Sequence, residues 1–178
     1  AFVVLEQHDL ASVESVRALF DLAFAALAKR RIGADRLPFA RDLLQHLAAA
    51  LYRRDPPGLG RIDVTLAESE LFDLVMAYGR EHQWMGLPSV EDLLVLVRKS
   101  GVLVGDAERL AFVHRSFFEY FLALELAHAL AADDYDLLSG QPLSQNVLSF
   151  LDSFQLDRPL LAALDSTRGR SFEEVRYR

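Results

Sequence analysis

The sequence predicts a mainly helical fold with one small β-hairpin. Apolar residues recur at intervals of three and four along most of its 178 residues, which is the spacing of one face of a helix. The period changes only over residues 102–113, where two short β-type runs flank a loop that contains glycine. Polar breaks with proline or glycine divide the chain into a helical region over residues 1–60, a second unit over residues 61–132, and short helices over residues 133–178.

The composition is that of a folded, soluble chain. Hydrophobic residues make up 52% of the sequence, and the mean hydropathy is +0.14. The formal charge of −7 disfavours nonspecific binding to nucleic acid or anionic lipid. The absence of cysteine removes disulfides, thiolate nucleophiles and cysteine metal ligands. No apolar run reaches the roughly 18–20 residues needed to span a bilayer, so no membrane partner is expected.

The first helix is expected to end in glycine. Residues 1–8 are apolar and β-branched, lack the basic region of a signal peptide, and look like a cut edge because the chain does not begin with Met. Asp9 or Ser12 can then cap a helix that runs to about Arg31, and Gly33 is expected to terminate it.

The second and third helices are separated by a firm break. The second helix begins near Pro38, since a first helical turn tolerates proline, and runs to about Arg54. The stretch DPPGLG at 55–60 cannot continue it. Thr65 and Glu68 have capping-box spacing, so we expect them to satisfy free N–H groups at the start of the third helix.

The order of the next elements is that of a winged-helix domain. Ser89 caps a fourth helix, and Gly101 ends it. The runs VLV at 102–104 and RLAFV at 109–113 are expected to pair as a hairpin, and another helix follows directly. Helix, helix, hairpin and helix within about 70 residues predict a winged-helix domain over residues 61–132, with the hairpin as its wing.

The C-terminal region is expected to be a helical linker or the start of a further region. After a polar connection, amphipathic helices are predicted from near Leu143 and from Pro159.

Most catalytic motifs are absent from the sequence. It has no G-x-x-x-x-G-K-[ST] phosphate loop, no G-x-S-x-G elbow and no H-E-x-x-H zinc motif. Its five histidines are scattered, and none is paired at metal-ligand spacing. The many carboxylates are those of solvated helix surfaces.

His114 is the residue that composition does not explain. It closes a β-type run and opens an apolar helix, where free N–H groups and the helix dipole favour anions. Its imidazole could hold a phosphate, or it could simply cap or pack. Arg115 reads as a solvated surface residue, and Ser116 with Glu119 again has capping-box spacing.

The segment around His114 carries a family resemblance. FVHRSFFEYFLALELA (112–127) resembles the F-x-H-x-[ST]-F-x-E-[YF]-x-A-A-x-x-L signature of NACHT-type nucleotide-binding proteins, which belong to the signal-transduction ATPases with numerous domains (STAND). LLVLVRKSGVLV resembles the segment that leads into the wing in that family, and PFARDLLQHLAAALYRR resembles the helical region before the winged helix. Order and spacing match over roughly residues 37–131. Phe118 stands where Gln is common, and Leu122-Ala123 replaces an Ala pair.

The resemblance implies a nucleotide switch. A P-loop module upstream of Ala1 would bind ATP, with Mg²⁺, or ADP, and the helical and winged-helix regions would fold back over it. His114 would contact the phosphates of ADP, with Arg115 as a weaker contact, and hold a closed monomer. Exchange to ATP would release the winged helix and allow a homo-oligomer to form in the cytoplasm, in immunity, antiphage defence or regulated cell death. This chain alone would hold no cofactor and would be no enzyme.

Two other classes stand beside this hypothesis: a DNA-binding winged helix and a purely protein-binding helical adaptor. The candidate recognition helix VEDLLVLVRKS begins acidic, is apolar, and offers only Arg98 and Lys99 at its far end. Helices that read the major groove place basic and amide side chains near their N-terminal part. The sequence therefore favours a chain without a nucleic-acid partner.

Overall fold

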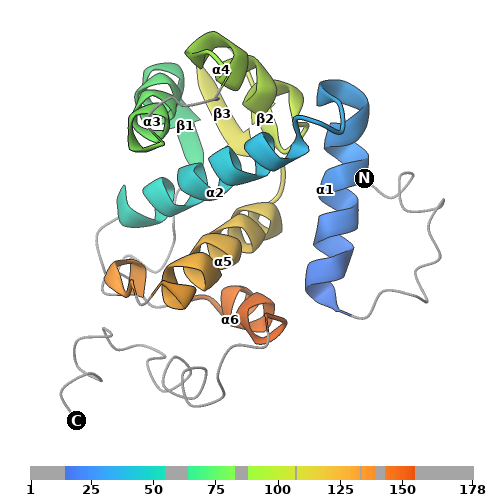
Figure 1. Ribbon diagram of the computed structural model, residues 1–178, viewed down its shortest axis with the longest axis vertical. Helices are drawn as coiled ribbons and strands as arrows, with labels where there is room; N and C mark the ends of the chain where they lie inside the picture. Colours follow the sequence, from blue (N-terminus) through green and yellow to red (C-terminus); the bar gives the residue numbers. More distant parts are fainter. Residues whose placement is uncertain are drawn as a thin grey trace.

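The fold is mainly helical, with a small antiparallel sheet on one side (Figure 1). The computed structural model describes residues 15–54, 64–82, 88–106, 108–132, 134–138 and 143–154. The helices are α1 (Val16–Ile32), α2 (Leu37–Arg54), α3 (Glu68–Glu81), α4 (Val90–Lys99), α5 (Arg115–Ala131) and α6 (Gln145–Asp152), with a 3₁₀ turn at Asp136–Leu138. The strands are β1 (Thr65–Ala67), β2 (Leu103–Gly105) and β3 (Arg109–Phe112).

The predicted end of α1 is confirmed, but its predicted start is wrong. Gly33 has φ 86°, a conformation that costs glycine little, and its N–H donates to Lys29 O at 3.1 Å. The cap is Ser15, whose Oγ accepts from Ala18 N at 3.1 Å. The proposed caps Asp9 and Ser12 lie outside the described residues, as do residues 1–8, the 55–60 break and the helix predicted from Pro159.

The predicted capping box of Thr65 and Glu68 is wrong, because Thr65 lies in a strand. Residues 65–67 form β1, which pairs with β3 through Thr65 and Ala111, Leu66 and Leu110, and Ala67 and Arg109. Leu66 is fully buried, so burial of its side chain and the ladder hydrogen bonds override the local capping pattern. Helix α3 starts only at Glu68, and Glu70 Oε2 accepts from Ala67 N at 3.4 Å.

The predicted hairpin is confirmed. Strands β2 and β3 pair antiparallel, and the sheet order is β1-β3-β2. Asp106 Oδ1 accepts from the N–H groups of Glu108 and Arg109, both at 2.9 Å, which closes the turn and lowers the pKa of the Asp106 carboxyl. The order α3, α4, β2, β3, α5 is the predicted helix, helix, hairpin and helix; β1 is an additional strand that was not predicted, and the winged-helix assignment stays a prediction.

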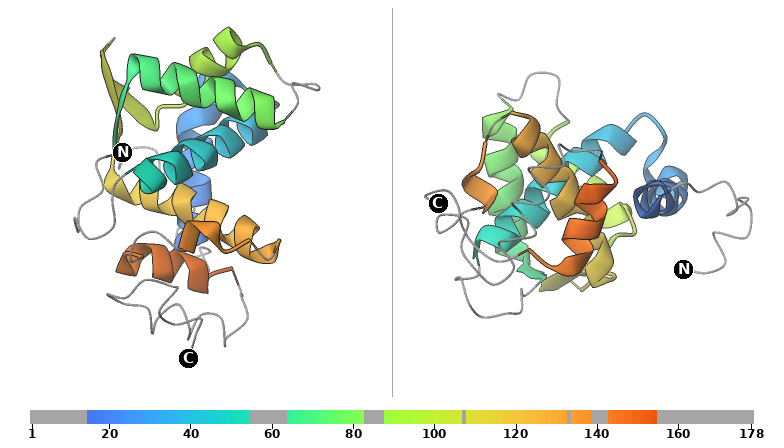
Figure 2. Two further views of the ribbon diagram at one scale, coloured as in Figure 1. Left: turned by 90° about the vertical axis from the view of Figure 1, so that its left-hand side faces the viewer. Right: turned by 90° about the horizontal axis from the view of Figure 1, so that it is seen from below.

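Helix α5 lies at the centre of the molecule. It passes between α2 on one side and α6 on the other (Figure 2), and the sheet leads directly into its N-terminus. Tyr120, Phe121 and Leu124, which recur at helical spacing, are buried, and Phe117 is half-buried against them. Ring contacts join α5 to its neighbours: Phe24 meets Phe121, Phe112 meets Phe118, and Phe20 meets Phe117, Tyr120 and Phe150.

Helix α3 is attached to α2 by an aromatic stack. Tyr78 is 1% exposed, and its ring lies 4.1 Å from that of His82 and 5.5 Å from that of His46, between centroids. Burial, helped by the charge of Asp42, raises the pKa of Tyr78 to about 12.

We expect this phenol to make the fold sensitive to alkali. Since the folded state holds the proton more tightly than the unfolded state, the stabilisation is complete below pH 10 and is lost as the pH rises from 10 through about 12. Urea unfolding over this range should show a smaller loss of unfolding free energy in Tyr78→Phe than in the native chain. Identical losses in the two proteins would contradict the assignment.

Candidate functional site

His114 caps helix α5, as one of its two sequence interpretations predicted. Its backbone is extended, with φ −149° and ψ 141°, and its Nδ1 accepts from Ser116 N at 3.1 Å. Its carbonyl oxygen also accepts from Phe117 N at 3.0 Å. Only Val113 separates it from β3, and Val113 N donates to Val102 O at 2.8 Å. Hydrogen bonds to the sheet on one side and to the first turn of α5 on the other therefore hold the backbone of His114 in place.

The cap uses Nδ1 and leaves the second ring nitrogen of His114, Nε2, free. A nitrogen that accepts a hydrogen bond carries no proton, so a neutral His114 carries its proton on Nε2. The side chain is exposed, and within the described part of the chain Nε2 has no hydrogen-bond partner. The cap therefore fixes the tautomer and presents an N–H donor to the outside, which suits an anionic oxygen. Capping and ligand binding are compatible roles for this residue.

Arg115 is tied to its own helix. Its Nε donates to Glu119 Oε1 at 3.2 Å, while its side chain remains 43% exposed. The predicted phosphate contact of Arg115 would have to come from the outer guanidinium N–H groups.

The predicted capping box of Ser116 and Glu119 is wrong, because the carboxylate points into the protein. Glu119 is 3% exposed and accepts from Ser144 Oγ at 2.9 Å and from Asn146 Nδ2 at 2.8 Å, besides Arg115. Ser144 is also the N-cap of α6, where its Oγ accepts from Val147 N. Glu119 thus joins the first turn of α5 to the first turn of α6. No local sequence pattern could reveal this contact, since its partners lie 25 and 27 residues away.

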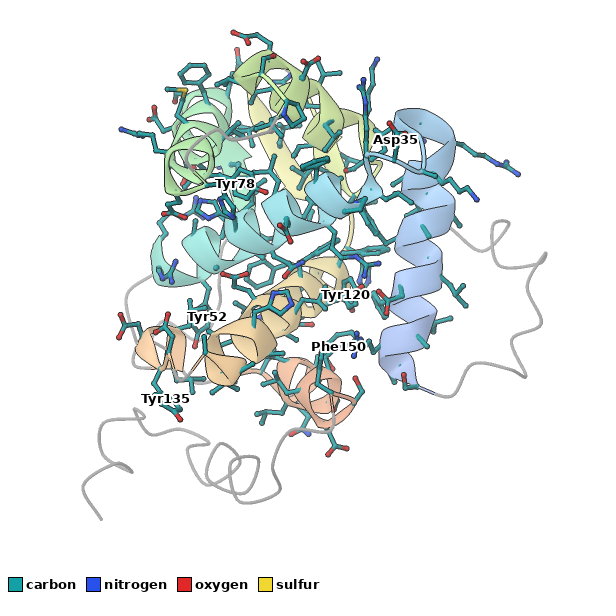
Figure 3. The ribbon with its side chains drawn as sticks, in the orientation of Figure 1. Asp35, Tyr52, Tyr78, Tyr120, Tyr135 and Phe150 are labelled. Carbon is teal, nitrogen blue, oxygen red and sulfur yellow. The ribbon has the colours of Figure 1, made fainter. Side chains whose placement is uncertain are left out.

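The next residue, Tyr120, holds a different helix. Its hydroxyl donates to Asp21 Oδ1 on α1 at 2.5 Å, and burial, reinforced by this bond, raises the pKa of the phenol. Asp21 also pairs with Arg41 Nη2 at 2.8 Å and with Arg17 Nε at 3.6 Å. Figure 3 shows Tyr120 and Phe150 together where α5, α1 and α6 meet, and their ring centroids are 5.7 Å apart.

Two kinds of feature are absent from the described segments. No group of three or more His, Asp or Glu side chains in these segments could hold a metal ion. Of the helices that the structure describes, none combines the length and the apolar character needed to cross a bilayer.

Comparisons with protein-family models, with curated proteins and with solved structures found no match for this chain. The resemblance to NACHT-type proteins therefore rests on the sequence segments alone.

We predict that Glu119→Gln destabilises the protein by about 1.5–3 kcal/mol, the usual value of hydrogen bonds to a charged group. The NH₂ group of the glutamine would face a hydrogen-bond donor of Ser144, Asn146 or Arg115. Two donors cannot bond to each other, so at least one hydrogen bond would be lost. Urea unfolding would measure the loss, and hydrogen exchange should show faster opening of α6.

A matched control lies on the same helix. Glu125 is partly buried, and burial raises the pKa of its carboxyl, which means that its charged form is disfavoured. Glu125→Gln should therefore leave the unfolding free energy unchanged or raise it. Equal destabilisation by the two substitutions would show that Glu119 has no special role in holding α6.

Proposed function

We propose that this chain is the helical and winged-helix segment of a NACHT-type signalling NTPase, and that it closes over a nucleotide bound by a P-loop module elsewhere in the protein. The observation that carries the proposal is the free, outward Nε2–H of His114 within the F-x-H-x-S-F-x-E-Y sequence. An N–H donor fixed by its own cap fits the oxygen of an ADP phosphate.

The surface around His114 also supports the proposal. Val113 and Val104 are 45% and 47% exposed. Val104 pairs with Ala111, and Val113, which follows β3 directly and donates to Val102 O, continues the alternation of side chains on the side of Ala111. Exposed valines on one sheet face beside the histidine fit a surface that another domain covers.

The rest of the switch follows from the resemblance. ADP or ATP, and the Mg²⁺ that accompanies ATP, would be held mainly by the P-loop module, with His114 as this chain's contribution and Arg115 as a second, weaker contact. Loss of the ADP contact would favour the open state and homo-oligomerisation in the cytoplasm, as a defence or cell-death response. By itself the chain would not be an enzyme.

The geometry of α4 weighs against the DNA-binding alternative. Its first turn carries Glu91 and Asp92, and its buried face consists of Leu93, Leu96 and Val97. Arg98, one of the two cations at its far end, is paired with Glu68. A helix with this charge pattern would repel the phosphates that flank a groove.

We predict that His114→Ser in the protein carrying its P-loop module will weaken ADP retention by about ten- to a hundredfold, the worth of one hydrogen bond to a charged group. Serine keeps a capping oxygen but has no Nε2–H, so the melting temperature of the nucleotide-free protein should stay nearly unchanged. Bound ADP, oligomer size and melting temperature should be measured on the same preparation.

His114→Ala is the companion variant. It should lose ADP to the same extent and also lose about 0.5–2 kcal/mol of stability, because the cap is removed as well. A monomeric His114→Ser protein with normal ADP content would leave His114 as a cap alone and refute the switch.

The proposal also makes a prediction for the isolated 178-residue chain. It should not hydrolyse ATP above a buffer control, and it should not bind duplex DNA with sub-micromolar affinity near physiological salt, where nonspecific complexes have Kd values of about 10⁻⁴–10⁻⁶ M. Fluorescence anisotropy would measure the binding. Tight binding would favour the DNA-binding alternative, and turnover would show a nucleotide site within the chain.

A further inference from the structure

A cavity of ≈ 700 Å³ lies between α1, α2 and α5, away from His114. Its volume is within the range of about 300–1,000 Å³ that small-molecule sites occupy. Its apolar wall comes from α2 and from the C-terminal half of α5, with Phe154 on a further side. The residues of that wall are Ala34, Leu37, Pro38, Leu124, Ala127, Ala131 and Phe154.

Two arginines line one part of the cavity. Arg17 and Arg41 share a single carboxylate, Asp21, which itself also accepts from Tyr120. Each guanidinium has five N–H donors, and the pair with Asp21 uses few of them. Arg17 is held further by the ring of Phe154, 4.2 Å from its Cζ to the centroid. Donors for an anionic group are thus fixed in place before a ligand arrives.

A carboxylate acceptor lines the cavity next to them. Gln45 also lines the cavity, but its Oε1 is shielded from solvent and has no hydrogen-bond partner among the described residues, so this oxygen is not a contact for a ligand. Asp42, one residue after Arg41 on α2, is exposed, lines the same cavity, and has no ion-pair partner within the described segments.

We propose that this cavity binds a small zwitterion of the amino-acid class with an apolar side chain. Its carboxylate lies against Arg17 and Arg41, and its ammonium donates to the Asp42 carboxylate. Its side chain lies against Leu37, Leu124 and Ala127. Neither a simple fatty acid nor an amine satisfies both sets of groups. The inference does not depend on the nucleotide switch, since none of these residues contacts His114.

The test uses three probes of similar shape with the full chain: phenylalanine, 3-phenylpropanoate, which lacks the ammonium, and phenethylamine, which lacks the carboxylate. Titration calorimetry and thermal shift at up to about 10 mM ligand would detect a Kd of about 1 mM. Phenylalanine should bind at least about tenfold more tightly than either analogue, because each analogue loses one charged contact.

Variants locate the site. Arg41→Met and Asp42→Asn should each weaken phenylalanine binding by about tenfold or more. Ala131→Trp, at an exposed rim position, should block the cavity without removing a polar contact. Arg80→Met on α3, outside the cavity, is the charge-matched control and should leave binding unchanged. The melting temperature of each unliganded variant shows that it is folded.

Three results would overturn the proposal: no binding of phenylalanine at the highest concentration, equal binding of 3-phenylpropanoate and phenylalanine, or full binding by Ala131→Trp. The second result would leave an anion pocket without amino-acid selectivity, and the third would place the ligand elsewhere on the chain.

Discussion

The burial of helix α5 is the constraint on which the rest of the structure depends. Ten of its 17 residues are buried, and a helix that is apolar nearly all round must be covered on every side. The elements α1, α2, α6 and the sheet provide that cover, as Figures 1 and 2 show. Helices α2 and α6 pack chiefly on α5, and a helix as short as α6 is ordered by packing rather than by its own propensity.

Two consecutive polar residues give this cover a defined geometry. Apolar burial is non-directional, so Leu and Phe contacts alone would tolerate several placements of the outer helices. Glu119 and Tyr120 point about 100° apart around the helix axis, given 3.6 residues per turn. Glu119 fixes the start of α6, and Tyr120 fixes α1 through Asp21. Because both groups are buried, a placement that left either one unpaired would be costly.

The sequence predicted what local chemistry decides. Gly33 and Ser89 act where positive φ and an N-cap oxygen are needed, and the apolar period predicted a helix after the hairpin, where α5 lies. Prediction from the sequence failed where an element depends on partners that are distant in the chain. The residues of β1 form a strand only because β3, more than 40 positions later, supplies the other half of the ladder, and the same pattern read locally looks like a cap. Glu119 was misread for the same reason: its spacing from Ser116 is visible, whereas its bonds to the start of α6 are not.

His114 and the cavity lie toward opposite ends of α5, since His128, which lines the cavity, is separated from His114 by about 21 Å at 1.5 Å per residue. A shared rigid helix does not by itself couple two sites, because a ligand shifts an equilibrium only through different affinities for its two states. The cavity would sense the switch only if α2 moved away from α5. The fully buried Leu43, Leu44 and Leu47 of α2 and Phe118 and Phe121 of α5 belong to one core, and separating these helices would expose it. At about 1.5–3 kcal/mol for each such side chain, that cost exceeds what a millimolar ligand can supply. We therefore expect α2 and α5 to move as one body, so that a ligand in the cavity stabilises this body in either state without choosing between them.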